Sequence, residues 1–102
     1  MNKYEALQDI IDNSKSIVLF TGAGISVPSG IPDFRSADGI YNQKTNIKAS
    51  PEDIISHSFF EKNTEDFFQF YKEKMIYPKA EPNAAHKYFA NLEKNGKNVI
   101  VI

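Results

Sequence analysis

Short apolar runs and amphipathic stretches alternate along this chain, and their spacing predicts its elements. Apolar residues recur at helical spacing over residues 4–11, which predicts a first helix that closes at Asn13 and Ser14. The run SIVLF at 16–20 is β-branched and aromatic and apolar on both faces, as is typical of a strand buried in a parallel sheet. The run NVIVI at 98–102 predicts a second strand of this kind. Because helices separate the two runs, we expect them to pair in parallel.

Helix boundaries between the strands follow from capping residues. In SPED, residues 50–53, the serine is a helix N-cap, the proline takes the first helical position and the aspartate is a capping-box acid. This pattern predicts a short helix through Ile54 and Ile55. An amphipathic helix is predicted over 82–95, and Gly96 ends it as a C′ residue.

Another helix, beginning at Asn63 or Thr64, has an apolar face made mostly of aromatic side chains: Phe67, Phe68, Phe70 and Tyr71. A face of this composition must be covered. We favour core packing over an aromatic binding site, because such stripes usually pack inside a protein.

The predicted fold class is α/β. A parallel sheet normally has more than two strands and helices on both faces, so two strands with several helices form only part of one. The chain stops inside the second strand, and we therefore expect residues 1–102 to be a single, incomplete domain, either the N-terminal piece of a larger one or a truncated product. Ligands of such sheets bind beyond the carboxyl ends of the strands, which is where the loop after residue 20 lies.

Composition narrows the classes of function. The 102 residues are 41% hydrophobic and 25% charged with a net charge of −1, so no general attraction to nucleic acid or to a membrane surface is expected. The absence of cysteine excludes disulfides, thiol catalysis and a thiolate zinc site, and two histidines make a poor metal site, so no metal site is predicted. The N-terminal residues do not resemble a signal peptide, and no apolar run reaches membrane-spanning length. We expect a cytoplasmic protein.

The loop after the first strand begins with TGAG at 21–24. Gly22 and Gly24 allow a tight turn and a close backbone approach to a phosphate, and Ser26 has a hydroxyl for capping or for a ligand. A Walker A loop is excluded because no Gly-Lys-Ser/Thr follows, and Val27 stands where a dinucleotide fingerprint has its third glycine. Taken alone, the segment is equally well explained as a simple turn.

The next residues favour a ligand site more strongly. Ser29–Gly30 and Ile31–Pro32 predict a second sharp reversal, after which an acid, an aromatic ring and a cation follow one another as Asp33, Phe34 and Arg35. Arg35 is the only arginine among the twelve basic residues. A forked, always-charged donor in such a loop favours contact with phosphate or ribose. The alternative is a structural pair between Asp33 and Arg35 that pins the loop.

The stretch GAGISVPSGIPDFRS, residues 22–36, resembles the signature of the sirtuins, the NAD-dependent protein deacylases. PNAAH at 82–86, FANLEKNGK at 89–97 and VIVI at 99–102 resemble the family's next helix and the strand that leads into its T-Q-N-I-D motif. The resemblance covers essentially the whole chain, which ends just before that motif. It implies the N-terminal part of a Rossmann-like parallel-sheet NAD-binding domain, without a zinc module, that uses NAD as co-substrate.

By this resemblance, the cofactor-binding residues are Gly22, Ala23, Gly24, Ser26, Val27, Ile31, Pro32, Asp33, Phe34 and Arg35. The glycine turn and Ser26 match the diphosphate and ribose loop, and Val27 replaces a threonine of some members, so a hydroxyl contact is lost. Ile31, Pro32 and Phe34 match the residues that line the nicotinamide pocket. Asp33 and Arg35 match residues that fix the loop and contact the cofactor. The region of about 36–50 resembles the family's mobile cofactor loop, which is expected to order over NAD.

In sirtuins the acyl-lysine carbonyl oxygen attacks the nicotinamide ribose, nicotinamide leaves, a histidine base assists the later steps and the acyl group ends on ADP-ribose. The resemblance therefore implies an NAD-dependent protein-lysine deacetylase whose partner is an acyl-lysine protein. No catalytic residue is assigned, because the base histidine is absent from this chain, as are the zinc ligands expected in a full-length relative. For His86 a packing or capping role is favoured over catalysis, and His57 is also not assigned. We expect the chain alone to be inactive.

One pair of residues bears on the acyl group. Members that prefer negatively charged acyl groups carry Tyr-x-x-Arg on a helix near this position, whereas here Tyr71 is followed at that spacing by Lys74. Because lysine lacks the bidentate fork for a carboxylate, deacetylation is the preferred activity. The alternative makes Tyr71 a core residue and Lys74 a solvated surface charge.

Two other functions stay open. The chain could be a non-catalytic module that binds NAD or ADP-ribose, or that depends on a complementary chain for the remaining strands. It could also belong to a sirtuin-like domain that cleaves NAD without a protein substrate.

Overall fold

The computed structural model describes residues 2–102, which form two compact units. The first, called here the sheet unit, comprises the described residues 2–25 and 82–102. The second, called here the helical unit, comprises Ser26–Glu81. Each unit is described by itself. No helix in residues 2–102 combines the length and the apolar character needed to cross a membrane.

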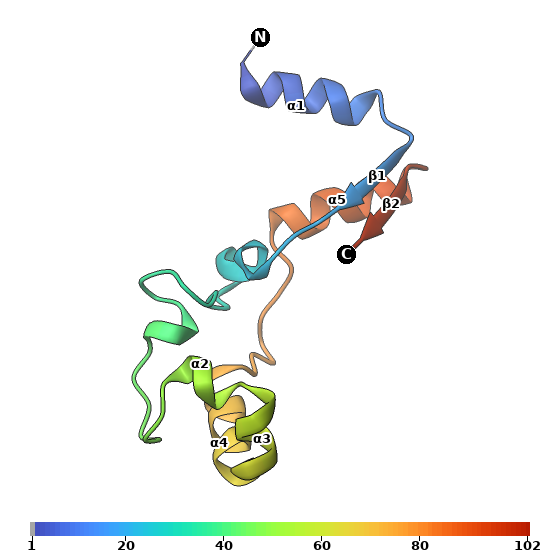
Figure 1. Ribbon diagram of the computed structural model, residues 1–102. Helices are drawn as coiled ribbons and strands as arrows, with labels where there is room; N and C mark the ends of the chain where they lie inside the picture. Colours follow the sequence, from blue (N-terminus) through green and yellow to red (C-terminus); the bar gives the residue numbers. More distant parts are fainter. Residues whose placement is uncertain (1) are drawn as a thin grey trace. The chain divides into compact units, whose positions relative to one another are not determined.

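The sheet unit contains α1 (Lys3–Asp12), β1 (Ser16–Leu19), α5 (Ala84–Lys94) and β2 (Asn98–Val101). The two strands pair in parallel, with Ser16 opposite Asn98 and Leu19 opposite Val101. Helix α5 lies alongside the strands, and β2 leads to the C-terminus (Figure 1). This arrangement confirms the predicted α/β class, with a parallel pair joined through helices.

Local capping chemistry fixes both ends of α5. Asn83 accepts a hydrogen bond from the Ala85 amide at 3.0 Å, and Nδ1 of His86 accepts one from the Asn83 amide at 3.1 Å, which completes a capping box. At the other end Gly96 has a φ of 104°, and the Lys97 amide donates to Leu92 O at 3.0 Å. These bonds form the glycine-terminated closure that the sequence predicted.

Hydrogen bonds tie α1 to the rest of the sheet unit. Nζ of Lys97 donates to the carbonyl oxygens of Asp12 at 3.2 Å and Ser14 at 2.6 Å, at the C-terminal end of α1. The side chain of Gln8 donates to the hydroxyl of Tyr88 on α5 at 3.1 Å. A cation beside unpaired helix carbonyls is favourable, so Lys97 stabilises the end of α1 as well as the start of β2.

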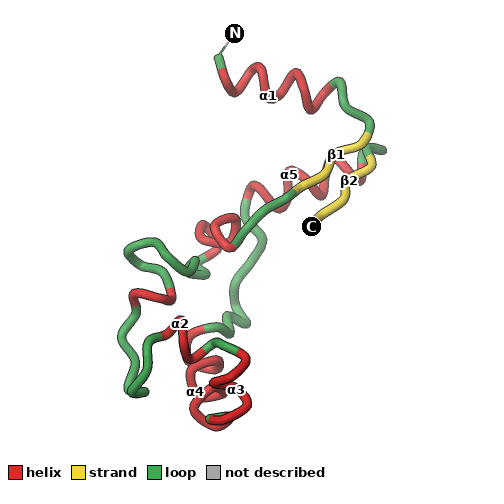
Figure 2. The backbone as a smooth tube through the Cα atoms, viewed as in Figure 1, coloured by secondary structure: helices red, strands yellow, loops and turns green. Residues whose placement is uncertain are grey.

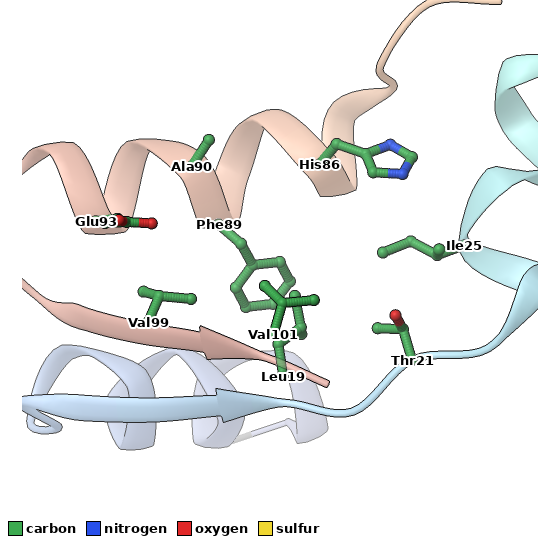
Figure 3. A pocket seen from close by; sticks show the side chains of 9 residues that line it. All are labelled: Leu19, Thr21, Ile25, His86, Phe89, Ala90, Glu93, Val99 and Val101. Carbon is green, nitrogen blue, oxygen red and sulfur yellow. The ribbon is translucent and has the colours of Figure 1, made fainter.

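One face of the strand pair is exposed, contrary to the prediction that both strands are buried on both faces. The side chains concerned have exposed fractions of 49% to 82%: Val18, Phe20, Ile100 and Ile102. The opposite face carries Leu19, Val99 and Val101, which lie toward α5 (Figure 3). Leu19 and Val99 are half-buried there, whereas Val101, at the end of β2, is still 67% exposed. Successive side chains of a strand point to opposite faces, so a helix on one side of the pair covers only alternate residues.

The helical unit is built from short elements joined by loops (Figure 2). A 3₁₀-helix, η1 (Ala23–Ser29), leads into it, and η2 (Ile40–Asn42), α2 (Pro51–Ile54), α3 (His57–Lys62) and α4 (Thr64–Lys74) follow. The Ser50 hydroxyl accepts from the Asp53 amide at 3.2 Å, as expected of the predicted N-cap. Helix α3 was not predicted; the Ser56 hydroxyl caps it by accepting from the Phe59 amide at 3.2 Å.

Three side chains from different elements make the core of the helical unit. Ile40 of η2, Ile54 of α2 and Phe70 of α4 have exposed fractions of 3%, 0% and 1%. Half-buried side chains pack around them: Phe34, Tyr41, Ile47, Ala49, Ile55, Phe59 and Met75. The core therefore connects α4 to the loop that contains Phe34.

The aromatic face of α4 is only partly buried. Core packing is confirmed for Phe70 but is wrong for Phe68 and Tyr71, which are 43% and 39% exposed. Phe68 instead joins an edge-to-face cluster with Phe60 and Phe67, with ring centroids 5.9 Å and 5.4 Å away. Because α3 and α4 are short, these rings cover one another at the surface rather than a deeper layer.

Candidate functional site

The glycine turn follows β1 directly. The Ile25 amide donates to Gly22 O at 3.4 Å, which starts the tight winding of η1. Neither Gly22 nor Gly24 has a positive φ, and a methyl group built on either meets no described atom within 4 Å. Packing within the described chain therefore does not require glycine at these two positions. Glycine there leaves bare backbone that a ligand can approach closely.

A helix closure turns the chain after η1. Gly30 has a φ of 89°, and its amide donates to Val27 O at 2.9 Å. The Ile31 amide donates to Ser26 O at 3.3 Å. This paired closure is the one seen at Gly96, and it produces the reversal that the sequence predicted for this segment. It holds Ser26 and Ile31 at the base of one turn.

Backbone bonds fold residues 33–36 against residues 39–42. Asp33 O accepts from the Ile40 amide at 2.7 Å, and Phe34 O accepts from the Tyr41 amide at 2.9 Å. Oδ1 of Asp33 accepts from both the amide and the hydroxyl of Ser36. Asp33 thus pins the loop, but through Ser36. No Asp33–Arg35 ion pair is found in residues 2–102, so the alternative of a structural pair is wrong.

One aromatic ring contacts both candidate ligand-binding side chains of this loop. The rings of Phe34 and Tyr41 have centroids 5.4 Å apart and planes inclined at 40°. Cζ of Arg35 lies 5.4 Å from the centroid of the same Tyr41 ring, within the range of a cation–π contact. Arg35 remains exposed. The guanidinium is therefore oriented from one side and open to an anion on the other.

Gly39 packs tightly against the same loop. It is buried, and a Cβ built on it would lie 2.6 Å from Phe34 O and 2.7 Å from Asp33 Oδ1. Sequence reasoning did not single out three residues that hold this loop: Gly39, Tyr41 and Asn42. The only sequence signal was a lone glycine, Gly39, in a polar segment. The three residues contact residues 33–36 only after the chain folds back on itself, and the sequence does not show this contact.

The predicted site residues fall in both units. Gly22, Ala23 and Gly24 belong to the sheet unit, and Ser26 through Arg35 belong to the helical unit. The helical unit brings Asp33, Phe34 and Arg35 together against Tyr41. The two residues predicted to bear on acyl selectivity lie on α4, where Tyr71 stacks on Phe67 at a centroid distance of 6.1 Å and Lys74 is half-buried.

A mainly apolar cavity of about 370 Å³ lies in the sheet unit (Figure 3). Its lining comes from the strands, the turn after β1 and α5: Leu19, Thr21, Ile25, His86, Phe89, Ala90, Glu93, Val99 and Val101. His86 lines one end, but its Nδ1 accepts the capping bond from Asn83, so the predicted capping role is confirmed. Nε2 of the other histidine, His57, lies 2.7 Å from Oε1 of Glu61 on the exposed surface of α3.

Known proteins resemble this chain along nearly its whole length. The Sir2 family model matches residues 22–102. The NAD-dependent protein deacetylase of Clostridium perfringens strain 13 is 56% identical over 96 residues, which are 94% of this chain and 39% of that protein. A structure of a Sir2 variant with a deacetylated p53 peptide and 3′-O-acetyl ADP-ribose has a TM-score of 0.78 and 39% identity, over 98% of this chain and 39% of that one.

A structure of Sir2Tm bound to a propionylated peptide has a TM-score of 0.71 and 36% identity, over 98% of this chain and 37% of that one. The chain spans about 39% of the length of the C. perfringens relative. The matches found by sequence and those found by structure therefore indicate the same family.

Proposed function

This chain belongs to the Sir2 family, and from that premise we propose that it supplies the NAD-binding part of an NAD-dependent protein-lysine deacetylase. The observation that carries the proposal is the glycine turn. Gly22 and Gly24 follow the carboxyl end of β1, where open parallel sheets bind their ligands, and each has space where a side chain would stand. A diphosphate fits bare backbone followed by a helical turn.

The residues present suit the parts of NAD. Backbone amides of Gly22, Ala23 and Gly24, with the Ser26 hydroxyl, would hold the diphosphate and ribose. Arg35 would add a charge-assisted hydrogen bond to phosphate or ribose. The apolar side chains of Ile31 and Pro32 would line the nicotinamide side together with the ring of Phe34, and Val27 would lie in the same cofactor loop. NAD, when bound, supplies the ADP-ribose that accepts the acyl group.

Residues 36–50 are proposed to order over bound NAD. Ile40 of this segment is buried in the core, and Tyr41, Ile47 and Ala49 pack against that core, whereas Ser36 and Asp38 lie exposed. The exposed part can order over a ligand without loss of the core.

We propose that the chain binds NAD without turning it over. Both histidines are engaged in structural contacts, since His86 caps α5 and His57 lies against Glu61. In a calorimetric titration the purified chain is expected to bind NAD, and Gly22→Ala is expected to raise the Kd about tenfold or more, because the methyl group blocks the approach of the diphosphate.

The matched control is Asn91→Ala, on the exposed surface of α5, which should bind NAD as the unchanged chain does. An acetyl-lysine peptide mixed with the chain and NAD should release neither nicotinamide nor the acetyl group. Equal NAD affinity of Gly22→Ala and the unchanged chain would contradict the assignment of the glycine turn. Turnover would contradict the proposed inactivity.

A complementary chain is proposed as the partner that restores activity. The exposed apolar face of β1 and β2 favours this arrangement, because Phe20 is 82% exposed and Ile102 is 69% exposed. The region of the C. perfringens relative that follows its matched part, expressed separately, is expected to co-purify with this chain and to restore deacetylation. Failure to co-purify would argue against partner-dependent assembly.

The acyl preference of that complex is expected to be for acetyl over succinyl peptides. Lys74 has a single ammonium and cannot form the two parallel hydrogen bonds that a carboxylate receives from arginine. Comparing release of the two acyl groups by mass spectrometry tests this, and a faster reaction with the succinyl peptide would contradict it.

A further inference from the structure

One side chain holds two successive backbone carbonyl groups, those of Arg35 and Ser36. Nδ2 of Asn42 donates to Ser36 O at 2.7 Å and to Arg35 O at 3.3 Å. Asn42 ends η2, whose first residue, Ile40, is buried in the core of the helical unit. The bonds therefore connect the exposed Arg35 loop to a fixed part of the fold.

The Cα of Arg35 lies between two peptide groups, and both are held by hydrogen bonds. Phe34 O accepts from the Tyr41 amide at 2.9 Å, and Arg35 O accepts from Nδ2 of Asn42 at 3.3 Å. Together these bonds restrict the backbone at Arg35, and with it the direction in which the Arg35 side chain leaves the backbone. Tyr41, the preceding residue, holds the side-chain end, since its ring lies under the guanidinium. Asn42 thus holds the backbone of Arg35, and the ring of Tyr41 holds its guanidinium.

We propose that Asn42 is a positioning residue that presents Arg35 to the nucleotide, an inference that rests on the proposed NAD-binding function. The chemistry requires an amide. Asparagine has two N–H donors on one nitrogen, whereas an aspartate of the same shape has acceptors only and would repel both carbonyl oxygens. Because Asn42 is exposed, its side chain is not needed for core packing, and hydrogen bonding is its structural contribution.

The single arginine of the chain makes a sharp test possible. An arginine-specific protease can cut this protein at one bond only, between Arg35 and Ser36, which is the bond that Asn42 holds. Cleavage requires local opening of the loop, so its rate reports the population of the open form. Asn42→Asp and Asn42→Ala are each expected to be cut roughly tenfold faster than the unchanged chain, since two hydrogen bonds are lost.

Asn63→Ala is the matched control. Asn63 is in the same unit and exposed, and it caps α4 without a side-chain hydrogen bond. This variant should be cut at the unchanged rate. The thermal midpoint of the Asn42 variants should stay close to that of the unchanged chain, whereas their Kd for NAD should rise by a similar roughly tenfold factor. A purely structural role would lower the midpoint instead.

Adding NAD separates the two proposals. Slower cutting of the unchanged chain in NAD supports the NAD site, and faster cutting of Asn42→Asp without NAD supports positioning by Asn42. If NAD has no effect but Asn42→Asp is cut faster, the loop-holding role stands and the NAD proposal fails. The positioning proposal is overturned if NAD protects the unchanged chain but Asn42→Asp has the same cleavage rate and the same Kd for NAD as the unchanged chain.

Discussion

Phe70→Ala is expected to unfold the helical unit. Phe70 is 1% exposed and packs with Ile40 and Ile54, the other two buried residues of this core. Replacing a buried phenylalanine by alanine removes its transfer free energy and leaves a cavity, at a cost of about 3–5 kcal/mol. A small unit with three buried core residues is near the lower end of domain stability, about 5 kcal/mol, so most of its free energy of unfolding is lost.

Thermal unfolding followed by circular dichroism measures this effect. The midpoint should fall by at least about 12 °C, since each kcal/mol shifts the midpoint of a small domain by about 4–8 °C. Phe68→Ala is the matched control, because the same ring on the same helix is 43% exposed and leaves no enclosed cavity. Its midpoint should fall much less. Equal falls for the two variants would contradict the assignment of Phe70, and not Phe68, to the core.

The same unfolding should also abolish NAD binding. Ile40 is the core residue that carries η2, and the amides of Ile40 and Tyr41 hold the carbonyl oxygens of Asp33 and Phe34. Without the core, the residues that present Phe34 and Arg35 lose their fixed position. Stability and ligand binding are therefore coupled through η2.

Gly39→Ala is expected to displace the Asp33–Phe34 segment. The added methyl group would lie 2.6 Å from Phe34 O and 2.7 Å from Phe34 C, closer than real Cβ contacts. Backbone atoms cannot rotate away as the end of a flexible side chain can, so the hydrogen-bonded pair of segments must separate. Overpacking of this kind costs about 1–3 kcal/mol.

Denaturant unfolding and NAD titration together measure the consequence. Gly39→Ala should lose both stability and NAD affinity. Gly22→Ala is the contrasting variant, because open space surrounds its added methyl group and its φ is not positive. It should keep the stability of the unchanged chain while losing NAD affinity. A Gly39→Ala protein with unchanged stability would contradict the close packing of Gly39 on Phe34.

Local chemistry explains which parts of the fold the sequence predicted correctly. The cap at Ser50, the reversal at Gly30 and the closure at Gly96 involve partners within five residues, so the residue types alone indicate them. The cap at Asn83 is equally local but was not predicted, because the predicted helix began at Pro82. Helix α3 escaped prediction because it is one short element, His57–Lys62, whose apolar pattern merges with that of the next helix.

The candidate site divides in the same way. The order of residues from Gly22 to Arg35 identified the loop, the family and its cofactor, since that information lies in a contiguous motif. The sequence could not show that Asp33 bonds Ser36 in place of Arg35, or that Tyr41 lies under Arg35. Both outcomes depend on where the chain returns after residue 36.

By itself the sequence determined the α/β class, the helix cap at Ser50, the helix closure at Gly96 and membership of the Sir2 family. Only the tertiary structure decided that Phe70 is buried while Phe68 and Tyr71 are exposed, and that Gly39 and Asn42 hold the Arg35 loop. The physical reason is the separation along the chain between the interacting residues. Capping and turn formation are settled by hydrogen bonds between near neighbours in the chain, whereas burial and close approach depend on which distant segments the folded chain brings into contact.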